Sequence, residues 1–83
     1  MDKIIFSFHA RMQMEERKIS EKLVISCLKK PLKTTLQKDN RFKAVKKVNR
    51  LKKTYLVVVI FDQLDGVKEI VTVFYTSKFH KYL

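Results

Sequence analysis

The sequence predicts an α+β fold in which two N-terminal helices pack on one face of a four-stranded antiparallel sheet. Two observations lead to this prediction. Apolar residues recur at helical spacing up to Pro31, the only proline, and β-prone runs follow it. The 83 residues suffice for one domain, 1–83, and 46% of them are apolar, so we expect the whole chain to fold.

The first part of the chain predicts a short strand and two helices. Lys3–Phe6 is apolar enough for a short strand. Ser7 is a suitable N-cap for a helix that runs to about Arg17. Ser20 is a second N-cap, and the apolar arc behind it predicts a helix that Pro31 ends, because proline has no N–H to donate.

The second part of the chain predicts the sheet. The expected strands are Thr34–Lys38, Phe42–Val48, Tyr55–Phe61 and Val67–Tyr75. Tyr55–Phe61 is uninterrupted and apolar, which is typical of a central strand covered on both faces, and Asp62–Gly66 is a turn. Strict alternation in the last strand places Ile70 and Val73 on opposite faces. We expect the helices to cover one face of the sheet and the other face to stay open.

Positive charge is concentrated in the middle of the chain. The formal net charge is +11, and residues 29–53, here called the basic segment, contain eleven lysines and arginines against the single acid Asp39. A block of one sign repels itself unless a partner neutralises it. The block is expected to edge or line the open face of the sheet. RNA is therefore the expected partner, and a solvated lysine face or an acidic antitoxin-like protein is the alternative.

Several other classes are disfavoured by the sequence. Leu56–Phe61, the longest apolar run, is too short to span a bilayer, so we expect a soluble cytoplasmic protein with no membrane partner. Cys27 is the only cysteine and is interpreted as a buried, reduced thiol. No ligand spacing for a metal and no glycine-rich phosphate loop is present, so neither a metal nor a cofactor is expected.

A motif in the first helix resembles a known family. Ser7–Ser20 reads S-F-H-A-R-M-Q-M-E-E-R-K-I-S, which resembles the pattern S-x-H-A-x-x-R-M-x-E-R-G-I-S of a prokaryotic domain family of unknown function. The matching residues are His9, Ala10, Met14, Glu16, Arg17, Ile19, Ser20, Pro31, Ile70, Thr72 and Val73. Two positions depart from the pattern: Gln13 replaces an arginine and Lys18 replaces a glycine.

The order of elements is similar to that of the RelE/ParE and BrnT toxin superfamily. That resemblance implies a compact ribonuclease-like domain paired with an antitoxin. Lys18, in place of glycine, predicts a helix corner of different geometry, because a side chain disfavours left-handed backbone. If the missing arginine contacts phosphate in the family, Gln13 weakens that role, and Arg11 is a replacement close by.

The residues needed for RNA cleavage without a metal are present. Such cleavage needs a base, an acid and cations around the phosphate. The catalytic candidates are His9, Arg17, Tyr75 and His80. The nucleic-acid-binding candidates are Arg11, Lys38, Arg41, Lys43, Lys46, Lys47 and Arg50. We therefore expect RNA binding, and possible cleavage is the leading enzymatic hypothesis.

Each candidate has a structural alternative. His9 can pack at the start of its helix, and His80 can be an ordinary residue of the C-terminal tail. Arg17 can pair with Glu16 or Glu21, which neighbour it in sequence. Tyr75 can belong to the core. The alternative function is a non-catalytic module that binds nucleic acid or docks an antitoxin through its basic face.

Overall fold

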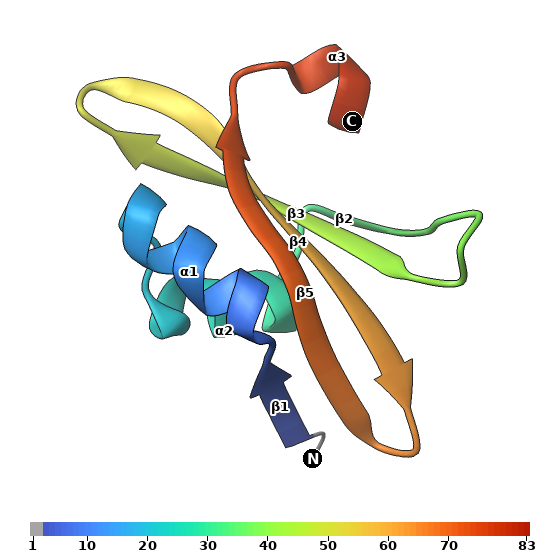
Figure 1. The fold of residues 1–83 in the computed structure, drawn as a ribbon. Coiled ribbons are helices and arrows are strands. Elements are labelled where there is room, and N and C mark those ends of the chain that lie inside the picture. Colours follow the sequence, from blue (N-terminus) through green and yellow to red (C-terminus); the bar gives the residue numbers. More distant parts are fainter. Residues whose placement is uncertain (1–2) are drawn as a thin grey trace.

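The computed structural model describes residues 3–83, which form a mixed five-stranded sheet with helices on both faces (Figure 1). In chain order the elements are β1 (Lys3–Phe6), α1 (Phe8–Arg17), α2 (Glu21–Lys29), β2 (Lys33–Leu36), β3 (Phe42–Arg50), β4 (Lys53–Leu64), β5 (Val67–Thr76) and α3 (Phe79–Tyr82). The strand order is β1-β5-β4-β3-β2, so β4 is central, as expected. The α+β class is confirmed, whereas the sheet differs from the four antiparallel strands that were predicted.

The fifth strand, β1, makes the sheet mixed because it runs parallel to β5. The N–H of Lys3 donates to the carbonyl of Gly66 at 2.8 Å, and that of Ser7 donates to the carbonyl of Ile70 at 3.0 Å. Two helices and three strands separate β1 from β5 in the chain, so no tight turn forces the two strands to be antiparallel. The sequence predicts the short strand but not its partner.

Helices α1 and α2 cover one face of the sheet (Figure 1). Both begin at the predicted serines: the N–H of Ala10 donates to Ser7 Oγ at 3.0 Å, and the N–H of Leu23 donates to Ser20 Oγ at 3.1 Å. Helix α2 ends just before Pro31, as expected. The core between helices and sheet contains Ala10, Met14, Ile19, Val24, Cys27, Ala44, Val57, Val59, Phe61, Ile70 and Val73.

The other face of the sheet is partly covered, although the sequence predicts it to be open. Phe79 and Tyr82 of α3 pack against a second apolar cluster formed by Val45, Leu56 and Val58. Because β4 is apolar on both sides, the face away from α1 and α2 also needs a cover. Helix α3 covers this face with the side chains of Phe79 and Tyr82.

Strand β5 contains a bulge that the sequence does not predict. The register between β4 and β5 shifts between Ile60 and Phe61, which leaves Val71 as an extra residue. A bulge of one residue reverses the faces of the residues that follow it. Ile70 and Val73 therefore lie on the same face, in the core, and the predicted strict alternation is wrong.

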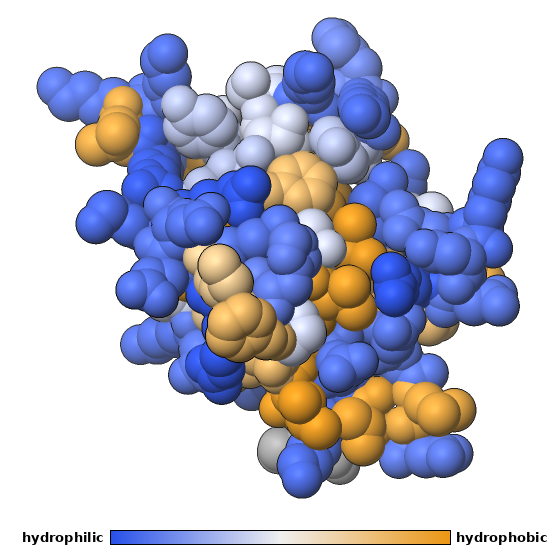
Figure 2. Space-filling view, in the orientation of Figure 1, coloured by the Kyte–Doolittle hydropathy of each residue, from blue (hydrophilic) through white to orange (hydrophobic). Residues whose placement is uncertain are grey.

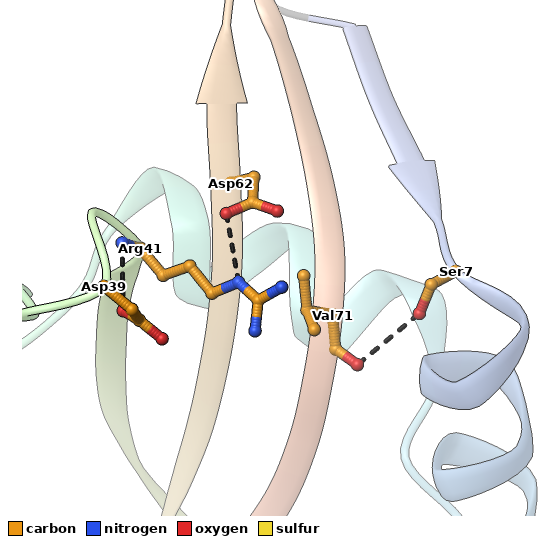
Figure 3. A network of polar contacts seen from close by, with 5 residues as sticks. All are labelled: Ser7, Asp39, Arg41, Asp62 and Val71. Atoms are coloured by element: carbon orange, nitrogen blue, oxygen red, sulfur yellow. Dashed lines mark hydrogen bonds and ion pairs between the residues drawn. The ribbon is translucent and has the colours of Figure 1, made fainter.

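Helix α1 is tied to this bulge by two side chains. The hydroxyl of Ser7 donates to the carbonyl of Val71 at 3.4 Å (Figure 3), and Gln13 Oε1 accepts a 2.9 Å hydrogen bond from the N–H of Val73. An arginine side chain has no acceptor and could not make the second contact. Gln13 therefore positions the helix on the strand.

The corner between α1 and α2 is left-handed even though no glycine is present. Lys18 has φ 55° and ψ 48°, and the N–H of Ile19 donates to the carbonyl of Met14 at 2.8 Å. The different corner geometry expected from Lys18 is therefore not found. A non-glycine residue in this conformation costs about 1 kcal/mol, which the packing around buried Ile19 offsets.

Candidate nucleic-acid interface

The basic segment extends from the end of α2 through β2 and β3 to the β3–β4 turn. Its cations do not all line one face, because alternate residues of a strand point to opposite sides. Lys43 lies on the α3 face, 5.1 Å from the ring centre of Tyr82. Lys46 and Arg50 lie on the opposite face, where Lys46 Nζ donates to Ser26 Oγ of α2 at 2.7 Å. The expectation of one cationic face is therefore wrong, and positive charge surrounds β3.

The remaining predicted cations of this segment differ in their availability. Arg41 Nε lies 3.2 Å from Asp62 Oδ1, and the Arg41 N–H donates to Asp39 Oδ1 at 3.2 Å (Figure 3). This arginine already has a carboxylate partner. Lys38 and Lys47 are exposed and can approach a polyanion.

The structure does not assemble the two predicted histidines into one centre. His9 is exposed in the first turn of α1, and Arg17 is in the last turn, about 12 Å away along the helix axis. His80 is exposed on α3, across the sheet from α1. Glu21, one of the expected partners of Arg17, instead pairs with Arg11 at 3.1 Å.

A cluster of arginine and tyrosine residues forms at the C-terminal end of α1. Arg50 Nη1 donates to the backbone carbonyl of Arg17 at 2.9 Å. The Arg50 guanidinium carbon lies 4.8 Å from the ring centre of Tyr75, whose ring centre lies 6.3 Å from that of Tyr55. The fold thus brings a predicted phosphate-binding residue, Arg50, to the predicted residues Arg17 and Tyr75.

A cavity of about 260 Å³, here called the tyrosine pocket, opens at this cluster and is lined by Arg50, Leu51, Tyr55 and Tyr75. Arg17 Nη1 is buried and makes no hydrogen bond within the described part of the chain. An unsatisfied buried donor costs about 1–3 kcal/mol, so an acceptor that reached this nitrogen would stabilise the protein. Tyr55 and Leu51 are not among the residues predicted for the site. The register of β3 with β4 pairs Tyr55 with Val48 and leaves Leu51 in the turn between the strands.

The turn beside the tyrosine pocket has a strained backbone. Leu51 and Lys52 have φ values of 51° and 66°, although turns with two positive φ values favour Asn and Gly. The β4–β5 turn, by contrast, uses Asp65 and Gly66 at φ 51° and 78°. Leu51 is 86% exposed, and Figure 2 shows a small apolar patch among hydrophilic side chains at the tip of this hairpin.

A larger cavity, of about 670 Å³, lies at the opposite end of the sheet. It is lined by Ile5, Asn40, Asp62, Gln63, Leu64, Asp65, Val67 and Glu69. Three of these residues are acidic, and their charge repels a polyanion. This cavity is the larger of the two, but the positive charge at the tyrosine pocket makes that pocket the better candidate site for a nucleic acid.

The single thiol belongs to the core. Cys27 is free and buried, and burial raises the pKa of its thiol from 9.0 to about 12, while the positive charge of Lys46 opposes this shift. The expected burial of this cysteine is confirmed. Within residues 3–83, the structure has no group of three or more side chains suited to a metal ion, and none of the helices is long and apolar enough to cross a membrane.

The fold and the tyrosine pocket together define a small α+β domain with a cationic, aromatic corner. The chain belongs to the family described as domain of unknown function DUF4258, which matches residues 6–75. No curated protein and no solved structure matches the chain. The expected family of unknown function is thus confirmed, whereas the similarity to the RelE/ParE and BrnT toxins stays a prediction.

Proposed function

We propose that this protein binds RNA, with an unpaired nucleotide in the tyrosine pocket and the neighbouring backbone phosphates on the basic segment. The observation that carries the proposal is the position of Arg50, which lies over Tyr75, bonds the Arg17 carbonyl and lines the pocket. One side chain thereby links the cationic strand β3 to the aromatic site.

The chemistry of the pocket fits a nucleotide. A guanidinium has five N–H donors, and the Arg17 carbonyl takes a bond from only Nη1 of Arg50, which leaves donors for phosphate oxygens. Tyrosine rings stack on bases of any sequence, and this contact is worth about 1–3 kcal/mol per base. The unpaired bases of RNA loops and single strands can turn outward to reach such rings.

The surrounding charge supports the same ligand. Lys52 and Lys53 follow the pocket residue Leu51 at the hairpin tip, and both are exposed. The acidic residues of the larger cavity are at the other end of the sheet. A polyanion is therefore attracted to the β3–β4 turn and repelled from the β4–β5 turn.

A matched pair of arginine variants tests the proposal. Arg50→Gln and Arg41→Gln each remove one positive charge, but only Arg50 lines the pocket, whereas Arg41 is paired with Asp62. With a fluorescent single-stranded RNA, we expect Arg50→Gln to weaken binding about tenfold or more and Arg41→Gln to weaken it about twofold. Equal losses would mean that only net charge matters and would contradict a specific pocket.

Cleavage is a second candidate function, supported by the contact of the Tyr75 ring with the Arg50 guanidinium. In this version, Arg50 would hold the phosphate, Tyr75 would donate the proton to the leaving 5′-oxygen, and water from the solvent would take the proton of the attacking 2′-hydroxyl. His9, at the opposite end of α1 from Arg17, and His80, on the helix that covers the other face of the sheet, would take no part. Incubation of RNA with the parent and Tyr75→Phe in the presence of EDTA tests it: products from the parent alone support cleavage, and no products from either contradict it.

Docking of an acidic antitoxin-like protein is the alternative use of the basic segment. Polyglutamate supplies the negative charge of such a partner without bases or ribose. If the tyrosine pocket takes nucleotides, polyglutamate at equal charge should displace the labelled RNA far less well than unlabelled RNA does. Equal displacement would favour the acidic partner.

A further inference from the structure

We infer that Leu51 is a wedge that separates neighbouring bases of a single-stranded RNA, so that one base enters the tyrosine pocket. This inference rests on the proposed function and names how that site selects its ligand. It follows from three properties of the β3–β4 turn: an exposed apolar side chain, a strained backbone and flanking cations.

The packing of the fold does not account for the exposure of Leu51. The side chain is 86% exposed and belongs to neither apolar cluster. A polar residue at this position would make the turn more soluble than leucine does. Its one defined place is the rim of the tyrosine pocket, which it lines together with Tyr55 and Tyr75. An apolar group at the mouth of a base-binding site is well placed to insert between stacked bases.

The backbone of the turn supports the same role. Leucine and lysine both disfavour positive φ, so the sequence keeps Leu51 and Lys52 at positions where Asn and Gly would be more stable. Strain of this kind concentrates at binding and catalytic sites, where it fixes a side chain in a working orientation. The turn thus holds the leucine outward at a cost in stability.

The flanking charges favour one class of partner. Arg50, Lys52 and Lys53 flank the leucine in the chain, and no acidic residue occurs between residues 40 and 61. Proteins that bind nucleic acid insert apolar side chains such as leucine between base steps while nearby cations bind the phosphates. An apolar protein partner would not need three cations around one leucine, so the combination favours RNA.

Two leucine variants test the wedge. Leu51→Asn removes the apolar wedge and places a residue that tolerates positive φ in the turn. Leu64→Asn is the matched control, because Leu64 is also exposed, at 73%, but lies beside the acidic turn. The probe is a single-stranded RNA with 2-aminopurine between two adenines. Its fluorescence rises when the wedge separates it from a neighbouring base that enters the pocket, whereas a 2-aminopurine stacked on tyrosine would stay quenched.

We expect the parent and Leu64→Asn to raise the fluorescence of this RNA on binding. Leu51→Asn should bind about tenfold more weakly, give no rise in fluorescence and yet unfold at a higher temperature than the parent. Equal fluorescence and affinity for Leu51→Asn and the parent would overturn the wedge while leaving the proposed function intact. If the parent bound no RNA, the wedge and the proposed function would both be overturned.

Discussion

The guanidinium carbon of Arg50 lies 4.8 Å from the ring centre of Tyr75. This contact joins the most basic strand of the sheet to the aromatic residues of the tyrosine pocket. Guanidinium and ammonium groups carry the same charge, but only the guanidinium is planar, stacks on a ring and binds phosphate through two donors. Shape, and not charge alone, should therefore matter at this position.

Arg50→Lys tests this relationship. The substitution keeps the charge but loses the stacking plane and the paired donors, so RNA affinity should fall about three- to tenfold. The slope of log affinity against log salt should not change, because the number of charges is the same. Affinity equal to that of the parent would contradict a planar contact, and fluorescence anisotropy at several salt concentrations measures both quantities.

Gln13 should matter for stability because it satisfies the N–H of Val73 beside the bulge. Gln13→Ala leaves that donor without its partner, which should lower the free energy of unfolding by about 1–3 kcal/mol. Gln13→Arg, which restores the residue usual in the resembling motif, should also be destabilising because arginine has no acceptor. Denaturant unfolding measures both variants.

Met12→Ala is the control for these variants, because Met12 lies on the same helix and is 46% exposed. Its effect should be within about 0.5 kcal/mol of the parent. A loss for Gln13→Ala no larger than that for Met12→Ala would show that the hydrogen bond to Val73 adds nothing to stability.

Lys18→Gly should stabilise the protein. Glycine adopts the left-handed φ of 55° without the steric cost that a side chain incurs, so the gain should be about 0.5–1 kcal/mol. Lys18→Ala keeps a Cβ and removes the same charge, so it should show no such gain. Thermal unfolding compares the three proteins, and a glycine variant no more stable than the alanine variant would refute left-handed strain at this corner.

Burial of Cys27 predicts a loss of stability at high pH. Its thiol has a pKa of about 12 in the folded chain against 9.0 ordinarily, so the unfolded chain loses this proton first as the pH rises. Below pH 9 the thiol does not change the free energy of unfolding. Between pH 9 and 12 its earlier ionisation in the unfolded chain should lower the free energy of unfolding by up to about 1.4 kcal/mol per pH unit.

Comparison with Cys27→Ala isolates this contribution, because every other titrating group is common to both proteins. The parent should lose stability more steeply than the variant above pH 9. Parallel curves of unfolding free energy against pH would show that the folded state does not hold the thiol proton.

Local signals in the sequence are sufficient for much of the fold. The caps Ser7 and Ser20, the stop at Pro31 and the apolar run of β4 each act within a few residues, so their consequences can be predicted. The pairing of β1 with β5 joins residues more than 60 positions apart in the chain, which no local pattern encodes. The bulge at Val71 lies between neighbouring strands, but no glycine or proline marks it in the sequence.

For the candidate site, too, the sequence predicts single residues but not how distant residues come together. Arg17, Arg50 and Tyr75 are identified one by one from their chemistry, but only strand register shows that they meet and that Tyr55 joins them. The histidines attract attention for the same chemical reason, and the sheet places them on opposite faces.

The salt dependence of RNA binding tests the central claim most directly. The parent protein is titrated with one single-stranded RNA at salt concentrations from about 50 to 200 mM. If the basic segment releases counterions from the phosphates, log affinity should fall linearly with log salt, with a slope of about −0.7 for each phosphate contact. Binding that is absent at low salt, or that does not change across this range, would contradict the account.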